Sequence, residues 1–198
     1  MLNVRARGFS LVELMVAVSV IAILMALAMP NFTSWIRNAR VRTVAESLQS
    51  SLRLAQTEAQ RRNQSVVLFR TSSKDCSTAA TVDAAGMQWQ LRSVPNPLMT
   101  DVADGPEAIQ CGVLTDVSTG VSITSTAATI CFAADGRQTT LTNPTNVGAD
   151  CAAGVARYRV EPTVSSAENR PLQLDVSLSG SVRMCDPKKP NTAPDGCR

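Results

Sequence analysis

Histidine is absent from this 198-residue chain, and aromatic residues make up only 4% of it. Without histidine the chain lacks the commonest general base and the commonest zinc ligand, which excludes Ser-His catalysis. Because large aromatic side chains are scarce, the core must consist mainly of small and β-branched residues. No catalytic set of residues emerges from the sequence, and carboxylate pairs cannot be located from one sequence, so we expect a protein that is not an enzyme and needs no cofactor.

The cysteine spacing argues against a metal or redox site as well, because no C-x-x-C pair occurs. Six cysteines in a small chain indicate an oxidising compartment. They allow fifteen disulfide connectivities. On sequence proximity alone we expect three pairs: Cys76–Cys111, Cys131–Cys151 and Cys185–Cys197.

The formal net charge of +3 is small and unevenly placed, because Arg5 and Arg7 lie among the first eight residues. Without these two, the remaining 17 basic and 16 acidic side chains leave only +1. The totals therefore do not describe a globally basic nucleic-acid-binding protein.

A run of 21 residues from Phe9 to Met29 contains a single charged side chain, Glu13. As a helix it is about 32 Å long, close to the hydrocarbon thickness of a bilayer. The arginines before it favour a cytoplasmic N-terminus, which places the cysteines on the oxidising side. A signal peptide cut at Ala26-Leu27-Ala28 and a plain membrane anchor are both compatible with this run. Neither explains why a carboxylate, which is costly in lipid, stands inside it.

The stretch Gly8-Phe9-Ser10-Leu11-Val12-Glu13-Leu14 resembles the class III signal of type IV prepilins and type II secretion pseudopilins. The resemblance implies that prepilin peptidase cuts between Gly8 and Phe9 and that the new N-terminal Phe9 is N-methylated. It also implies that Glu13 pairs with the terminal ammonium of Phe9 in a neighbouring subunit. Such a pair satisfies two charges that are costly to leave alone in an apolar filament core.

An amphipathic helix is predicted to follow the apolar run. Pro30 resembles the helix-bending proline of many pilins, and it removes one helical hydrogen bond. Apolar residues then recur at spacings of three and four, which is typical of one buried helix face: Val41, Val44, Ala45, Leu48, Leu52, Ala55 and Ala59. We expect the charged residues between them to be solvated and the helix to end at Asn63. We interpret Trp35, near the bend, as a packing residue.

Beyond the helix the pattern changes to short strands, expected at residues 66–70, 88–92, 121–125, 129–133, 157–160, 172–178 and 181–185. Asp135-Gly136 and Ser179-Gly180 predict tight hairpin turns. We interpret Trp89, in the second of these strands, as a packing residue. The order of a long helix followed by antiparallel strands predicts an α+β domain.

Two motifs narrow the resemblance: Cys131-Phe-Ala-Ala-Asp-Gly136-Arg137 and Leu178-Ser-Gly180-Ser-Val-Arg183-Met-Cys185 are similar to the GspH/FimT/FimU group of minor pilins and pseudopilins. The resemblance implies a type IV pilin-like fold with two antiparallel sheets packed on the helix. The expected segments are a cleaved leader (1–8), a transmembrane and filament-core helix (9–29), the amphipathic half of the helix (30–62) and a globular β domain with a disulfide-closed tail (63–198).

The function implied is that of a FimU- or FimT-like minor pilin in a priming complex at the pilus tip, supporting twitching motility, adhesion or DNA uptake. The implied partners are other minor pilins, the major pilin, prepilin peptidase, the inner-membrane assembly platform and, before assembly, membrane lipid. The expected location is the inner membrane with the globular domain in the periplasm, and later the pilus tip at the cell surface. A GspH-type pseudopilin of a type II secretion system is the nearest alternative, and a secreted disulfide-rich protein is a more distant one.

A DNA-binding minor pilin for natural transformation is a further alternative. Relatives in DNA-uptake pili bind DNA through a G-R-x-R hairpin, but here Gly180-Ser181-Val182-Arg183 lacks the first arginine. Arg183, Lys188 and Lys189 are the candidate DNA contacts. A few phosphate contacts give weak, salt-dependent binding. We therefore favour a solvated, disulfide-closed tail over a DNA site.

Overall fold

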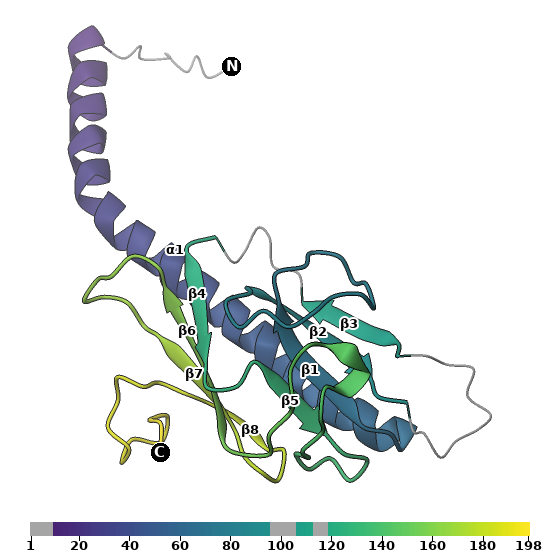
Figure 1. The fold of residues 1–198 in the computed structure, drawn as a ribbon. Helices are drawn as coiled ribbons and strands as arrows, with labels where there is room; N and C mark the ends of the chain where they lie inside the picture. Colours follow the sequence, from purple (N-terminus) through teal and green to yellow (C-terminus); the bar gives the residue numbers. More distant parts are fainter. Residues whose placement is uncertain (1–9, 96–105, 113–118) are drawn as a thin grey trace, which may run out of the picture. The chain divides into compact units, whose positions relative to one another are not determined.

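The computed structural model describes residues 10–95, 106–112 and 119–198, and within these it leaves out the side chains of residues 27–31. The chain divides into two compact units, residues 1–36 and 37–198, and helix α1 (Leu11–Arg62) contributes to both (Figure 1). The expectation of one long N-terminal helix is confirmed. Pro30 lies within the range of α1, but its side chain is not described, so the expected bend stays a prediction.

The strands of the second unit form two four-stranded antiparallel sheets. The first has the order β3-β2-β1-β5 and consists of β1 (Val66–Thr71), β2 (Gln88–Ser93), β3 (Ala108–Gly112) and β5 (Thr129–Phe132). The second has the order β4-β6-β7-β8 and consists of β4 (Val121–Ser125), β6 (Ala156–Pro162), β7 (Leu172–Val176) and β8 (Val182–Cys185). A short 3-10 turn, η1 (Pro144–Asn146), lies between β5 and β6. The α+β class with two sheets is therefore confirmed.

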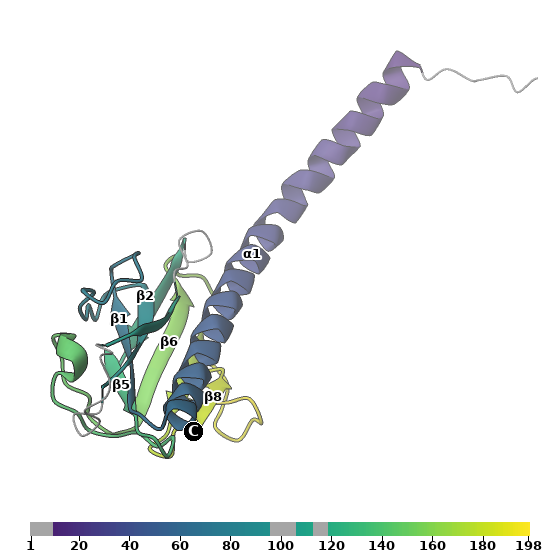
Figure 2. The ribbon, with the colours of Figure 1, turned by 90° about the vertical axis from the view of Figure 1, so that its right-hand side faces the viewer.

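The main core lies between the second part of α1 and both sheets, and Figure 2 shows this part of α1 alongside the strands. All seven residues of the predicted apolar stripe are buried there, with exposed fractions of 0–1%. They meet residues such as Leu68 of β1, Ile130 of β5 and Leu174 of β7. A second, smaller cluster covers the other face of β1 and includes Val67 and Phe69. Strand β1 is consequently buried on both faces, as its pattern shows.

The ends of elements follow the local chemistry that the sequence predicts. Asn63 ends α1 in the left-handed conformation (φ 53°), and its N–H donates to the Gln60 carbonyl at 3.3 Å. The turn between β7 and β8 closes through Gly180 N–H donating to the Ser177 carbonyl at 2.9 Å. The turn after β5 closes in the same way, from Gly136 N–H to the Ala133 carbonyl at 2.8 Å. Both predicted hairpin turns are therefore present.

Three disulfides connect Cys76 to Cys111, Cys131 to Cys151 and Cys185 to Cys197. These are the pairs expected from sequence proximity. The first joins the segment between β1 and β2, which contains Cys76, to β3, which contains Cys111. The second joins β5, which contains Cys131, to the segment before β6, which contains Cys151. The third closes the C-terminal tail onto the end of β8.

Two expectations differ from the structure. Strand β3 was not expected, because Ala108–Gly112 contains a single β-branched residue and pairs only with β2 at a sheet edge. The interpretation of Trp35 as a packing residue is wrong, because its side chain is 66% exposed. The position of Trp35 on α1 does not by itself indicate whether the side chain is buried. Trp89, which is also expected to pack, is 1% exposed, so this expectation is confirmed.

Candidate functional site

The N-terminal part of α1 carries the residue expected to direct assembly. Glu13 lies in the first turn of α1, where a negative charge is favoured by the helix dipole. Its backbone N–H donates to the Ser10 hydroxyl at 3.2 Å, which caps the helix. The Glu13 side chain is exposed and is therefore accessible to a partner. Gly8 and Phe9, the predicted processing and methylation positions, lie outside the described residues.

The apolar side chains around Glu13 are exposed among the described residues of the first unit. Between Leu11 and Met25 the large apolar side chains are 50–75% exposed. This is a large apolar surface, and such a surface marks contact with a partner or with lipid. Within the described residues, no helix has both the length and the apolarity needed to cross a membrane.

The three predicted DNA contacts lie in β8 and the C-terminal tail, and each one already binds the protein itself. The Arg183 guanidinium donates to the carbonyls of Pro194 and Gly196 at 3.1 and 3.0 Å. The Lys188 ammonium donates to the Asn169 carbonyl at 2.7 Å. Lys189 forms an ion pair with Asp195.

These contacts hold the tail against the second sheet. Arg183 ties β8 to the end of the tail, and Lys188 ties the tail to the β6–β7 loop. The same loop also contacts α1, where the Asn38 side chain donates to the Glu168 carbonyl at 3.0 Å and accepts from the Arg170 N–H at 2.9 Å. The geometry thus gives Arg183 and Lys188 a positioning role in the fold.

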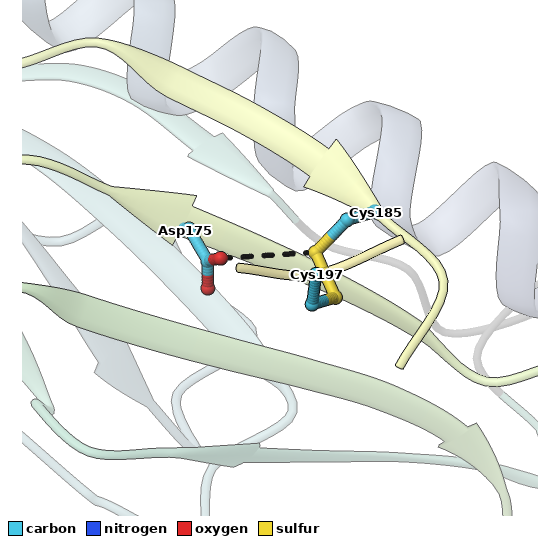
Figure 3. Close-up of side chains that lie close together, drawn as sticks. All are labelled: Asp175, Cys185 and Cys197. Atoms are coloured by element: carbon cyan, nitrogen blue, oxygen red, sulfur yellow. Dashed lines mark hydrogen bonds between the residues drawn. A yellow bond between two sulfur atoms is a disulfide. The ribbon is translucent and has the colours of Figure 1, made fainter. Parts of the chain in front are cut away.

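The close group of Asp175, Cys185 and Cys197 is the one set of potential metal ligands found among the described residues (Figure 3). The two cysteines form a disulfide, so neither offers a thiolate to a metal. The Asp175 carboxylate lies 3.7 Å from Cys185 Sγ, which carries no proton to donate. The group is part of the tail closure and not a metal centre.

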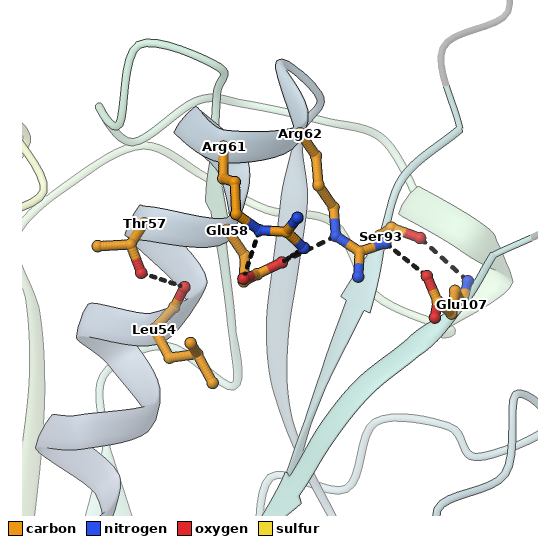
Figure 4. A network of polar contacts seen from close by, with 7 residues as sticks. All are labelled: Leu54, Thr57, Glu58, Arg61, Arg62, Ser93 and Glu107. Atoms are coloured by element: carbon orange, nitrogen blue, oxygen red, sulfur yellow. Dashed lines mark hydrogen bonds and ion pairs between the residues drawn. The ribbon is translucent and has the colours of Figure 1, made fainter.

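A charged network closes the C-terminal end of α1 and was not anticipated from the sequence (Figure 4). The Glu58 carboxylate accepts hydrogen bonds from Arg61 at 2.7 Å and from Arg62 at 2.8 Å. Arg62 also donates to the Glu107 carboxylate, which lies just before β3, at 2.5 Å. The hydrogen bonds from both arginines lower the pKa of Glu58 to about 2. The network fastens the helix end to the first sheet.

Two arginines are buried among the strands, although arginine is rarely buried without partners. Arg70 of β1 is 2% exposed and donates to the Gly86 carbonyl at 2.7 Å and to the Ile123 carbonyl of β4 at 2.7 Å. It therefore joins the first sheet to the second. Arg92 of β2 is fully buried and lies 5.0 Å above the Phe69 ring. Burial lowers the pKa of both guanidinium groups.

A polar hollow of about 330 Å³ lies beside β4, β6 and the β6–β7 loop. Its lining is rich in hydroxyl groups, including Ser122, Thr163 and Ser166. Its three charged residues are engaged within the protein, since Arg159 Nε donates to Glu161 at 2.9 Å and the Lys188 ammonium donates to the Asn169 carbonyl at 2.7 Å. The lining holds no activated nucleophile and no apolar floor, so it does not have the composition of an active site.

Comparison with known families gives two matches along the chain. Residues 3–29 match the prokaryotic N-terminal methylation motif, and residues 44–180 match the type II transport protein GspH. No curated protein shows significant sequence similarity. Together the two matches cover the apolar helix and most of the second unit.

Solved structures with a similar fold come from two bacteria. The type IV minor pilin FimU of Pseudomonas aeruginosa is 13% identical, with 80% of this chain and 95% of that chain covered and a TM-score of 0.46. The minor pseudopilin EpsH of the Vibrio cholerae type 2 secretion system is 12% identical, with 76% of this chain and 99% of that chain covered and a TM-score of 0.47.

Proposed function

The chain belongs to the family of the type II transport protein GspH, and from this premise we propose that it is a minor pilin of a type IV pilus, similar to FimU or FimT. The observation that carries the proposal is the order of the two family matches in one chain, a methylation motif followed by a GspH domain. In this role the protein is a structural subunit of the priming complex at the pilus tip and catalyses no reaction.

Assembly depends on the first turn of α1. We propose that prepilin peptidase removes residues 1–8, that Phe9 becomes the methylated N-terminus, and that Glu13 pairs with the Phe9 ammonium of a neighbouring subunit. The exposed Glu13 side chain and the uncovered apolar residues around it support this arrangement. A charge-assisted pair is strong where water is excluded, so it sets the register between neighbouring helices.

The proposed location follows from the same segment. Before assembly the apolar helix lies in the inner membrane, with the second unit in the periplasm, where its three disulfides are stable. During assembly the helix moves from lipid into the filament core, and the protein reaches the cell surface. The proposed partners are other minor pilins, the major pilin and the inner-membrane platform.

A second candidate is a minor pseudopilin of a type II secretion system, and membership of the GspH family favours it. The same residues have the same roles in this alternative. Deletion of the gene separates the two functions. Loss of surface pili with normal protein secretion supports the minor pilin, whereas loss of secreted proteins with normal pili supports the pseudopilin.

The assembly mechanism is tested with the full chain in a host that makes the complete machine. Mass spectrometry should show a mature chain that begins at N-methylated Phe9, and a chain beginning at Met29 would contradict the proposal. Glu13→Gln removes the charge but keeps the shape, and it should be processed normally yet be depleted from sheared filaments. Glu46→Gln is the matched control, because Glu46 is also an exposed carboxylate on α1, paired with Arg42. Equal amounts of both variants in the filaments would rule out the pairing role of Glu13.

The DNA-binding alternative gains no support from the tail. Its three candidate contacts, Arg183, Lys188 and Lys189, are engaged by carbonyl oxygens or by Asp195. Phosphate contacts would have to compete with these bonds. We therefore keep the non-DNA role as the proposed function.

A further inference from the structure

The aromatic side chains of the described residues fall into two distinct groups. Four of them are buried in the second unit, with exposed fractions of 0–1%: Phe69, Trp89, Phe132 and Tyr158. The other two, Phe32 and Trp35, are 60% and 66% exposed. They lie three residues apart on α1, so they share one helix face. Their rings stack with centroids 6.0 Å apart. Both exposed aromatic residues of the part of the chain that the structure describes thus form a single pair.

The position of this pair along α1 points to what covers it. Phe32 and Trp35 follow the apolar run 9–29 within two helical turns. With a rise of about 1.5 Å per residue, their Cα atoms lie about 20 and 24 Å from residue 19, the middle of the run. Side chains on a helix lean toward its N-terminus, which moves both rings a few ångströms back toward that middle.

These distances match the headgroup layer of a bilayer. The hydrocarbon core extends about 15 Å from the midplane, and the headgroups end at about 20–22 Å. A run centred in the membrane therefore places both rings beyond the hydrocarbon and among the headgroups. Tryptophan is enriched at this level, because its ring favours the apolar side while its N–H finds a polar partner.

We propose that Phe32 and Trp35 form an interfacial anchor that holds α1 at the lipid headgroup layer in the unassembled subunit. The anchor rests on the proposed function, since it requires the run 9–29 to enter a bilayer. It opposes sliding of the helix in either direction, because moving the pair inward buries the indole N–H and moving it outward exposes two aromatic rings to water. The anchor thus fixes the height at which Glu13 meets the growing filament.

Tryptophan fluorescence tests this directly, because the chain has only two tryptophans. The full chain is placed in vesicles of zwitterionic and anionic phospholipids that carry bromine either near the headgroup or near the end of the acyl chain. In Trp89→Phe, Trp35 is the sole emitter. We expect shallow bromine to quench its emission strongly and deep bromine to quench it weakly. Equal emission in brominated and plain vesicles would overturn the anchor, as would stronger quenching by deep bromine.

Two further variants keep the result decisive. Trp35→Phe leaves only the buried Trp89, and its emission should be unaffected by either lipid. If Trp89→Phe does not fold, the difference in quenching between the native chain and Trp35→Phe measures the same quantity, because both retain Trp89. Val20→Trp, combined with Trp35→Phe and Trp89→Phe, places the only tryptophan near the middle of the run, and quenching of its emission by deep bromine reports insertion itself.

The combination separates failure of the anchor from failure of the proposed function. Deep quenching at position 20 with no quenching at Trp35 leaves membrane insertion intact but refutes the anchor, and then a neighbouring subunit is the partner of the aromatic pair. No quenching at either position refutes insertion, and the anchor fails with it. Deep quenching at position 20 together with shallow quenching at Trp35 supports both.

Discussion

The contact between the two hairpin turns can be tested by replacing one hydrogen atom with a methyl group. Gly180 lies in the turn between β7 and β8 with φ +85°, and a Cβ atom there would lie 2.2 Å from the Gly136 carbonyl oxygen. It would also lie 2.6 Å from the side-chain nitrogen of Gln56 on α1. Gln56 donates to that same Gly136 carbonyl at 3.0 Å. Gly180→Ala therefore disturbs the point at which both sheets meet the helix.

The cost has two parts. A non-glycine residue at positive φ destabilises the folded state by about 1 kcal/mol. The methyl group also pushes apart the two turns, since a backbone carbonyl cannot rotate away as a side chain can. Losing the Gln56 hydrogen bond at a half-buried site adds about 2 kcal/mol. The total of about 3 kcal/mol should lower the melting temperature by roughly 6–12 °C in a domain of this size.

The chain supplies two control positions, one with the backbone cost alone and one with neither cost. Gly148 has φ +88° with no atom within 4 Å of the position that a Cβ would take, so Gly148→Ala incurs the backbone cost alone, about 1 kcal/mol. Gly154 has an ordinary φ and open surroundings, and Gly154→Ala should be close to neutral. Thermal unfolding of the full-length variants in the same detergent, followed by near-ultraviolet circular dichroism, gives the three melting temperatures. If Gly180→Ala loses no more stability than Gly148→Ala, the close approach of the turns is refuted.

Three further predictions concern the end of α1 and the tail. The pKa of Glu58 is lowered from 4.5 to about 2 in the folded chain, so its stabilising contribution is complete above pH 4.5 and is lost as the pH falls toward 2. Between about pH 5 and about pH 3, the free energy of unfolding measured with urea should therefore depend less on pH in Glu58→Gln than in the native chain. An equal pH dependence in both proteins would contradict the network. Replacing Cys185 and Cys197 together by serine should lower the free energy of unfolding by about 3 kcal/mol, measured by urea titration; an unchanged midpoint would show that the tail adds no stability. Arg183→Ala and Lys188→Ala should speed amide exchange in the tail without changing DNA affinity in fluorescence anisotropy, and a loss of tight DNA binding would restore the DNA-binding alternative.

Much of the fold could be predicted because its signals are local in the sequence. The stripe from Val41 to Ala59 follows helical periodicity, and all of its members are buried. Gly136 and Gly180 mark turns, because their positive φ values favour glycine. The three disulfides join cysteines that are neighbours in sequence order. The helix stripe and the turns depend on residues that are close together along the chain, whereas the disulfides join cysteines 12 to 35 positions apart.

The roles of individual charged residues could not be predicted in this way. Arginine is rarely buried without partners, yet Arg70 and Arg92 lie inside the fold, where backbone carbonyls such as those of Gly86 and Ala80 accept their hydrogen bonds. Arg183 and Lys188 looked like candidates for phosphate binding, and the carbonyls that engage them belong to Gly196 and Asn169. A charge acquires its partner only when the chain has folded.

The sequence by itself determined the family, because the matches at residues 3–29 and 44–180 depend only on the order of residues along the chain. The sequence also predicted the long helix and the hairpin turns, and its lack of histidine excluded catalysis by a histidine side chain. Only the tertiary structure decided which cations bind groups within the protein and which aromatic rings remain outside it. The physical reason is that burial and hydrogen bonding depend on groups brought together by folding, while periodicity and motif spacing are properties of the unfolded chain as well.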